Sequence, residues 1–167
     1  MKVYLNRPIK KEAWGGGSHF ITGLAEFLIK KNISVVFDLN EPNIDCIFMF
    51  DPRPDNLGLN SVNHIYYYKK INPRTKIVQR INDTDIARPK DKPWRIDMLL
   101  KSNVIADHTI FISNWLKNHY IEHGYNSNKK HTVILNGCNP EHYFPDEKKN
   151  DISKQEKVKL VTHHWSD

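Results

Sequence analysis

The sequence predicts an α/β protein with a Rossmann-like, doubly wound parallel sheet. Short apolar runs of strand length, rich in β-branched residues, recur along the whole chain. Between most of them lie stretches whose apolar residues are spaced by three and four positions, which is the period of an amphipathic helix. This alternation is typical of parallel strands joined by helices that cover both faces of one sheet.

Each expected element follows from a local pattern. Strands are expected at residues 3–7, 33–37, 46–50, 76–81, 109–112 and 131–135. Helices are expected from about residue 19 to residue 28 and at residues 61–71, 94–104 and 114–123. Asn60 or Ser61 caps the second helix, Ser113 caps the fourth, and Gly124 ends it. Tyr66, Tyr67 and Tyr68 are expected to pack as part of the second helix.

Length and composition set the class of protein. The chain has 167 residues, of which 39% are hydrophobic, so it is long enough for one domain with a core. Its longest apolar run, residues 46–50, is far shorter than the ~20 residues of a membrane-spanning helix. The N-terminus lacks the apolar core of a signal peptide, and two cysteines make neither a disulfide framework nor a zinc spacing. We therefore expect a cytoplasmic protein.

The net charge of +6 leaves three classes of anionic partner open. These are nucleic acid, an anionic lipid surface and phosphorylated small molecules. The lysine doublets are scattered along the chain, and no stripe alternates basic and aromatic residues. Nucleic acid is therefore not expected, whereas peripheral contact with a membrane surface through the doublets stays open.

A glycine-rich segment precedes the first expected helix. Gly15, Gly16 and Gly17 let the backbone approach a ligand closely, and Ser18 is placed to cap the helix. The free N–H groups of a first helical turn favour an anion. The segment is neither a G-x-G-x-x-G dinucleotide motif, since position 20 is Phe, nor a P-loop. A flexible turn between strand and helix is the alternative interpretation.

A polar segment follows the fourth expected strand. Arg80, Asn82 and Asp83 stand where that strand ends, and ligands of open parallel sheets bind at the carboxyl ends of strands. The competing interpretation is an Asx-type turn that ends the strand.

No metal site is expected. Residues 83–85 match a D-x-D pattern, but three residues match easily by chance and no further ligand cluster supports them. His119 and His123 share one helix face without the intervening Glu of a zincin, and His163 and His164 are adjacent near the end. We interpret the first pair as a surface stripe and the second as the end of a strand.

Two further sequence motifs lie in the C-terminal half of the chain. Residues 111–116 read Phe-Ile-Ser-Asn-Trp-Leu, and residues 134–145 read Ile-Leu-Asn-Gly-Cys-Asn-Pro-Glu-His-Tyr-Phe-Pro. With the glycine-rich and Arg80 segments, they resemble the N-terminal domain of a family 4 glycosyltransferase of the GT-B fold, over most of the chain. Residues 134–145 are similar to the family's N-G-V-D-x-x-x-F joint between domains, with Cys138 for the usual valine and Asn139 for the usual aspartate.

The resemblance implies a two-domain enzyme. Residues 1–145 would be its N-terminal, acceptor-side domain, residues 146–157 a linker, and residues 158–167 the start of a truncated C-terminal, donor-binding domain. The intact enzyme would transfer a sugar with retention from a nucleotide sugar to a hydroxyl of a glycan or lipid acceptor, without a metal or other cofactor. The missing domain would supply most of the donor site, including glutamates at E-x7-E spacing, so the isolated chain is expected to be nearly inactive.

The resemblance also implies roles for single residues. Asn82 and Asp83 match a catalytic position where many relatives place a His-Asp pair, and Arg80 would orient that loop on the acceptor side or meet an anionic group. The residues over the donor phosphates or the reacting sugar would be Gly15, Gly16, Gly17 and Ser18. The residues that shape the interdomain joint would be Asn136 and Gly137.

A function of another class remains open. The chain would then be a non-catalytic Rossmann-like module that binds a phosphorylated small molecule or a protein partner.

Overall fold

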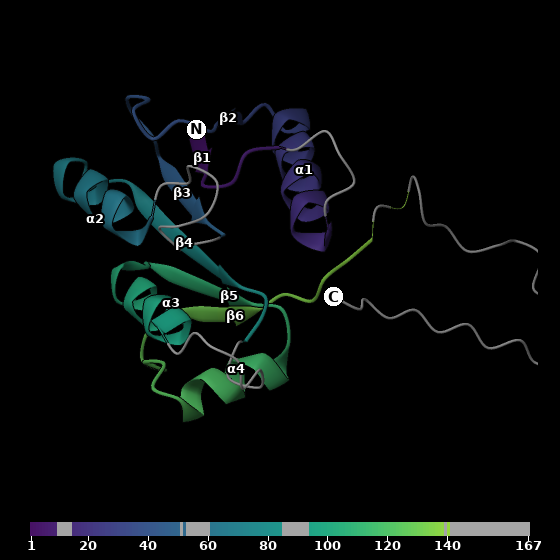
Figure 1. The fold of residues 1–167 in the computed structure, drawn as a ribbon. Coiled ribbons are helices and arrows are strands. Elements are labelled where there is room, and N and C mark those ends of the chain that lie inside the picture. Colours follow the sequence, from purple (N-terminus) through teal and green to yellow (C-terminus); the bar gives the residue numbers. More distant parts are fainter. Residues whose placement is uncertain (10–14, 51, 53–60, 85–93, 139, 141–167) are drawn as a thin grey trace, which may run out of the picture. The chain divides into compact units, whose positions relative to one another are not determined.

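The computed structural model describes residues 1–9, 15–50, 52, 61–84, 94–138 and 140 (Figure 1). The chain divides into two units, Met1–Asn136 and Gly137–Asp167, and all helices and strands described below belong to the first. The expected linker at residues 146–157 and the expected domain start at residues 158–167 lie outside the described residues.

The first unit contains one sheet of six parallel strands. In chain order these are β1 (Lys2–Leu5), β2 (Ser34–Val36), β3 (Cys46–Met49), β4 (Lys76–Ile81), β5 (His108–Phe111) and β6 (His131–Val133). The strands lie side by side in the order β2-β1-β3-β4-β5-β6 (Figure 1). Every expected strand among the described residues is present, so the predicted α/β class with a Rossmann-like parallel sheet is confirmed.

The strand order reverses at β1. From β1 the chain passes to β2 on one side, then crosses back so that β3 pairs with the other side of β1, where Tyr4 lies opposite Ile47. Every later strand adds on that second side. The carboxyl ends of β1 and β3 therefore form the topological switch point, which is where ligands of such sheets usually bind.

Four helices connect the strands: α1 (Gly15–Lys30), α2 (Val62–Ile71), α3 (Trp94–Ile105) and α4 (Asn114–Glu122). The predicted cap of α4 is confirmed, because Ser113 Oγ accepts a hydrogen bond of 3.1 Å from the backbone N–H of Leu116. Gly124, with φ of +101°, ends that helix in the left-handed conformation as expected. Ser61 is the cap of α2, and its backbone N–H donates to Nδ1 of His64.

The start of α1 differs from the prediction. The helix begins at Gly15, whose φ of +62° turns the chain into it, so Ser18 lies inside the first turn and not at the cap. Glycine suits the first position of this turn because it adopts a positive φ without steric cost. The glycines are therefore part of the amino end of α1 and not of a separate loop.

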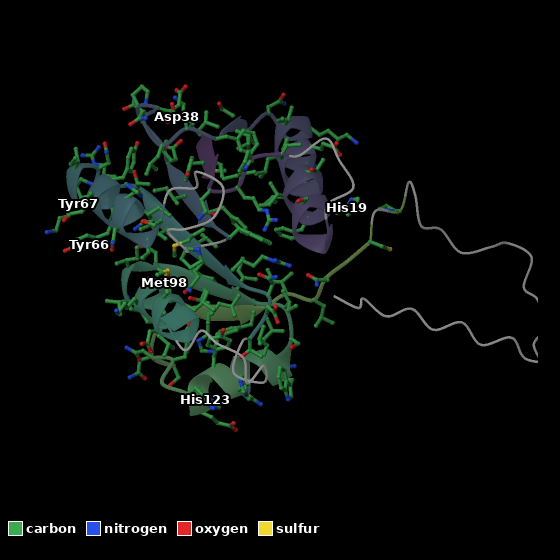
Figure 2. All side chains as sticks on the ribbon, viewed as in Figure 1. His19, Asp38, Tyr66, Tyr67, Met98 and His123 are labelled. Carbon is green, nitrogen blue, oxygen red and sulfur yellow. The ribbon has the colours of Figure 1, made fainter. Side chains whose placement is uncertain are left out.

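The expected packing of the α2 tyrosines is confirmed for Tyr68 only. Its ring packs against the core, and its hydroxyl donates to the carbonyl of Glu41 and accepts from the N–H of Ile44, each at 3.2 Å. Tyr67 is 63% exposed and Tyr66 is partly exposed, and both lie at the outer side of α2 (Figure 2). The prediction was therefore wrong for Tyr67.

The helices cover the two faces of the sheet unequally. On one face α1 packs against Val3 and Leu5, and on the other α2 and α3 pack against Tyr4, Ile47 and neighbouring residues. Burying each such large apolar side chain stabilises the fold by about 1.5–3 kcal/mol. A third cluster joins α4 to the ends of β4 and β5.

A polar network is buried between β4, β5 and α3. Nε2 of Gln79 donates to the carbonyl of Leu99 at 2.8 Å, and Oε1 of Gln79 accepts from Oγ1 of Thr109 at 3.3 Å. Nδ2 of Asn103 reaches the same Thr109 hydroxyl at 3.5 Å. Gln79 is fully buried, so these bonds satisfy an amide that would otherwise destabilise the core.

Charges are paired at the amino ends of β4 and β5. Oδ2 of Asp107 accepts from Nζ of Lys69 at 3.2 Å and from the backbone N–H of Ile77 at 2.8 Å. Nζ of Lys76 lies 3.7 Å from Oδ1 of the same carboxylate. Partial burial would raise the pKa of Asp107, but the hydrogen bonds from Ile77 and Lys69 and the charges of both lysines outweigh it and lower this pKa.

Candidate anion-binding site at the carboxyl edge of the sheet

Asn6 joins the two strands of the switch point. It follows β1 directly and is 1% exposed. Its Oδ1 accepts a hydrogen bond of 2.7 Å from the backbone N–H of Phe50, and its own N–H donates to the carbonyl of Phe48 at 3.3 Å. These bonds hold the residues after β1 beside the residues after β3, which places Arg7 next to Phe50.

Two arginines lie over one aromatic ring. The guanidinium carbon of Arg7 is 5.3 Å from the centre of the Phe50 ring, and that of Arg80 is 5.1 Å away. Arg80 also lies 3.8 Å from the centre of the Phe20 ring, and the two phenylalanine rings stack at 5.8 Å. Such cation–π contacts hold a guanidinium in place without neutralising it.

The positive charge of this group is not compensated by a described carboxylate. Arg80 is only 5% exposed, and its Nη2 donates to Oδ1 of Asn136 at 2.9 Å. In the described part of the chain no Asp or Glu forms an ion pair with Arg7 or Arg80. Burial lowers the pKa of Arg80 to about 10, so it still carries its charge near neutral pH. Nε of Arg7 is buried without a hydrogen-bond partner.

The amino end of α1 lies against these arginines. A Cβ added to Gly17 would stand 3.1 Å from Nη1 of Arg7 and 3.2 Å from Cζ of Phe50. Ser18 in the same turn is 4% exposed, and its Oγ is buried without a partner. The free N–H groups of the first turn add to the positive potential of the helix end. We call Arg7, Gly15–Ser18 and Arg80, with the rings of Phe20 and Phe50, the anion cradle.

The chemistry of the cradle suits an anion with several oxygens. Guanidinium groups donate paired hydrogen bonds to phosphate or carboxylate, and helix N–H groups supply further donors. Among the described residues outside its own helical turn, none places a heavy atom within 4 Å of a Cβ added at Gly16, which leaves room for a ligand there. A phosphate or diphosphate is the class of group that these residues fit.

Asn82 and Asp83 behave differently from Arg80. Both are exposed, and Oδ1 of Asp83 accepts from the N–H of Thr84 at 2.8 Å. The hydroxyl of Tyr120 donates to the carbonyl of Asp83 at 3.1 Å, so α4 holds this turn. An Asx turn would instead bond the backbone N–H two residues on, so this bond to the adjacent residue leaves the turn interpretation a prediction. Asp85 lies outside the described residues.

The residues of the expected joint fall in different units. Asn136 ends the first unit and binds Arg80, whereas Gly137 opens the second and is exposed. Most of the joint motif, including Asn139, lies outside the described residues.

Sequence reasoning missed Arg7, Phe20 and Phe50. Arg7 was expected as the last residue of the first strand, whereas β1 ends at Leu5 and leaves Arg7 after it, and its importance depends on the strand order. Phe20 and Phe50 fit the apolar patterns of a helix and a strand, and only the structure shows their rings under the arginines.

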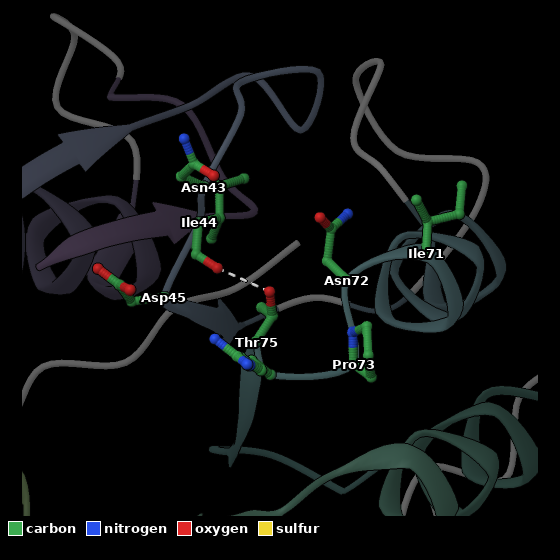
Figure 3. Close-up of a pocket in the computed structure, with 8 residues that line it drawn as sticks. Asn43, Ile44, Asp45, Ile71, Asn72, Pro73 and Thr75 are labelled. Carbon is green, nitrogen blue, oxygen red and sulfur yellow. Dashed lines mark hydrogen bonds between the residues drawn. The ribbon is translucent and has the colours of Figure 1, made fainter.

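A hollow of about 320 Å³ lies at the opposite edge of the sheet. It is formed where the chain enters β3 and β4, and Oγ1 of Thr75 donates to the carbonyl of Ile44 at 2.7 Å beside it (Figure 3). Its lining residues are Asn43, Ile44, Asp45, Ile71, Asn72, Pro73, Arg74 and Thr75. Ligands of parallel sheets bind at the carboxyl edge, so this hollow is not the candidate site.

Among the described residues, no helix combines the length and the apolar character needed to cross a membrane. Comparison with protein-family profiles and with curated proteins finds no match to this chain.

Proposed function

We propose that this chain is the N-terminal, acceptor-side half of a retaining glycosyltransferase of the GT-B type, as its motifs suggest. The observation that supports this most is the anion cradle at the switch point, where the buried charge of Arg80 has no described carboxylate partner. When a sugar leaves a nucleotide sugar, negative charge develops on the departing diphosphate. Donors that are fixed in advance stabilise that charge in the transition state.

The residues take distinct roles in this proposal. The first-turn N–H groups at Gly16 and Gly17 donate to the leaving phosphate, and Arg80 provides a fixed positive charge beside them. Asp83 is exposed at the carboxyl end of β4, where its carboxylate holds a hydroxyl of the transferred sugar. Asn82 offers an amide to the same sugar but cannot act as a base. Asn136 orients Arg80 through its 2.9 Å hydrogen bond.

The decisive test has a genetic and an enzymatic part. The source transcript is sequenced beyond the codon for Asp167, and the longest product of that frame is assayed for label transfer from a panel of nucleotide sugars. We expect a second α/β domain with glutamates at E-x7-E spacing, and transfer with retained anomeric configuration. A stop codon directly after Asp167, or a longer product that transfers no sugar, would overturn the proposal.

Variants of that longer product test the assignments of single residues. Gly16→Val should abolish transfer without affecting the fold, because the side chain enters open space where the ligand would lie. Asp83→Ala should lower kcat/KM, whereas Glu26→Ala, which removes an exposed carboxylate from α1, should not. Near-normal turnover of Gly16→Val would contradict the position of the donor.

A second candidate function is a non-catalytic module that binds a phosphorylated small molecule. The observation that favours it is that Arg7, Ser18 and Arg80 all belong to the first unit, so the cradle does not need a second domain. Calorimetry on the 167-residue chain separates the two. Micromolar binding of a phosphorylated metabolite or a nucleotide sugar by the chain alone favours the module, because the glycosyltransferase places most of the donor site elsewhere.

A further inference from the structure

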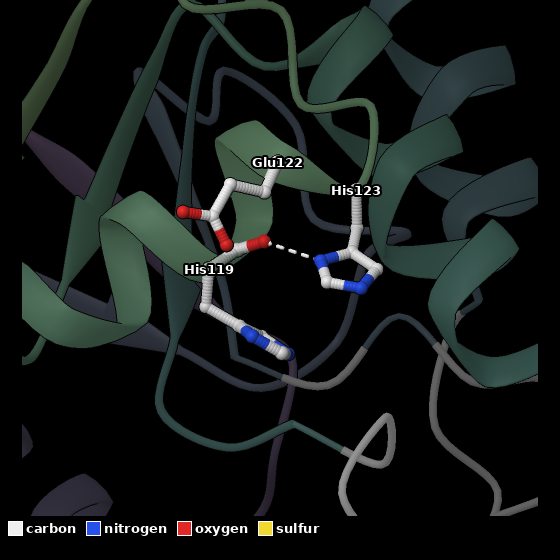
Figure 4. Close-up of side chains that lie close together, drawn as sticks. All are labelled: His119, Glu122 and His123. Carbon is white, nitrogen blue, oxygen red and sulfur yellow. Dashed lines mark hydrogen bonds between the residues drawn. The ribbon is translucent and has the colours of Figure 1, made fainter.

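Three potential metal ligands gather at the carboxyl end of α4, far along the chain from the glycine-rich segment. They are His119, Glu122 and His123, and one ligand atom from each lies within 4.8 Å of the other two (Figure 4). Residues three and four positions apart share one face of a helix, so the helix itself brings these side chains together. Neither the fold nor the proposed function requires this grouping.

The His123 ring has one nitrogen committed and one available. Its Nδ1 lies 2.7 Å from the backbone carbonyl of His119, and because a carbonyl only accepts, Nδ1 carries the proton (Figure 4). In the neutral ring Nε2 then keeps a free lone pair. Histidine ligands of metal ions usually donate their other N–H to a carbonyl or carboxylate in this way.

The His119 ring is held by neighbours on two elements. It stacks on Trp115 at 5.0 Å between ring centres, with an interplanar angle of 11°. Its Nε2 lies 3.2 Å from Oγ1 of Thr84, which follows β4. These contacts restrict the ring before any ion binds, which lowers the ordering cost of binding.

The charge around the cluster favours a cation. Glu122 is exposed, and no described Lys or Arg forms an ion pair with its carboxylate. The carboxyl end of a helix carries partial negative charge, which also attracts cations. Two imidazoles and one carboxylate form a ligand set that suits zinc and other late first-row ions better than magnesium or calcium.

We propose that His119, Glu122 and His123 bind one divalent late transition-metal ion of the zinc class, with water completing its coordination. In a tetrahedral zinc site, bonds of about 2.0–2.2 Å place ligand atoms roughly 3.4 Å apart. Because the present ligand atoms lie within 4.8 Å of one another, the side chains must approach by as much as about 1.4 Å. Glu122 and His123 are both exposed, so side-chain rotation, mainly of Glu122, supplies this movement. The site does not depend on the proposed glycosyltransferase function.

The test is a zinc titration of the 167-residue chain by calorimetry in competition with a chelator. The background carries His163→Ala and His164→Ala, because that adjacent pair offers a competing site. We expect one ion per chain, and at least tenfold weaker binding in His119→Ala and in His123→Ala. His19→Ala, which removes an exposed histidine from α1, is the matched control and should bind as the background does. Absence of saturable binding, or affinity that survives both α4 substitutions, would overturn the site.

Two further variants keep the proposal testable if His119→Ala misfolds. Glu122→Gln is an exposed substitution that should weaken zinc binding while the circular dichroism spectrum stays unchanged. Thr84→Val removes the hydroxyl partner of His119 and should weaken binding about tenfold, as outer-shell changes commonly do. Nitrogen NMR of the zinc-loaded chain should show the ion on Nε2 of His123. Unchanged affinity in Glu122→Gln and Thr84→Val together would contradict the proposal.

Discussion

The two edges of the sheet differ in whether the charged side chains described there form ion pairs. At the amino edge, Asp107 forms ion pairs with Lys69 and Lys76 and also accepts a backbone hydrogen bond, so these three charges have partners. At the carboxyl edge, Arg7 and Arg80 contact aromatic rings, and no described carboxylate pairs with them.

This difference indicates that the charges at the amino edge stabilise the fold, whereas those at the carboxyl edge are available to bind a ligand. Paired, partly exposed charges stabilise the folded chain modestly and need nothing further. A buried and uncompensated charge destabilises the folded chain, and an anionic ligand relieves that cost when it binds. The lowered pKa of Arg80, which burial alone causes, reports the same cost.

The largest expected effect is stabilisation by phosphate. At constant ionic strength, inorganic phosphate should raise the melting temperature of the chain. The free energy of unfolding should rise by ~2.7 kcal/mol when the phosphate concentration is one hundred times its dissociation constant. Arg80→Met should lose this response because it removes the buried charge. Lys76→Met, which removes a paired charge at the other edge, should keep it. An equal phosphate response in both variants would contradict the contrast.

Without any ligand, substitutions at the two edges should change the free energy of unfolding in different directions. Asp107→Ala leaves the N–H of Ile77 without its acceptor and removes the ion pairs to Lys69 and Lys76, so urea unfolding should show a loss of about 1–3 kcal/mol. Lys69 keeps its hydrogen bond to the carbonyl of Thr75. Arg80→Met replaces an uncompensated buried charge with an apolar chain and should leave stability unchanged or raise it. Comparable destabilisation by both would show that Arg80 is structural.

Adjacent glycines provide a smaller and sharper test of the cradle geometry. An added methyl group at Gly17 presses on Arg7 and on the packed Phe50 ring, whereas at Gly16 it meets open space. Gly17→Ala should therefore be less stable than Gly16→Ala by about 1 kcal/mol in urea unfolding. Equal stability would mean that the first turn of α1 does not lie against Arg7 and Phe50.

The smallest effect is the pH dependence from Asp107. Its pKa is lowered in the folded chain, so its contribution to stability is present above the unfolded value of about 3.9 and is lost as the pH falls through the folded value. Unfolding free energies of the wild type and Asp107→Asn should therefore converge in acid. A difference that persists or grows with acidification would refute this direction. The side chain is 34% exposed, so screening keeps the effect small.

The predictions of helix and strand bounds were correct where they depended on residues next to one another in the sequence. β4 has the predicted bounds, because polar residues directly precede and follow it in the sequence. Ser113 was predicted as the cap of α4, and serine directly before a helix is a common local signal for its start. The start of α1 was missed because three consecutive glycines resemble a loop, although the first turn of a helix accepts them.

The parts of the site that could not be predicted depend on strand order. Arg7 became relevant only once β1 was known to lie between β2 and β3, and no sequence pattern states that order. Glu122 was overlooked because a zincin motif carries its Glu directly after the first histidine, whereas Glu122 lies three residues after His119. Residues three and four positions apart on a helix share one face, so Glu122 and His123 both lie beside His119.

The buried amide of Gln79 has a consequence for the neighbouring residue. A shift of β4 by one residue would reverse the parity of the strand, turn Gln79 toward the opposite face and break its bonds to Leu99 and Thr109. Because adjacent residues of a strand point to opposite faces, the same amide dictates that Arg80 points toward Phe20. The uncharged Gln79 on one face of the sheet thus fixes the register of β4, and with it the position of the Arg80 charge on the other face.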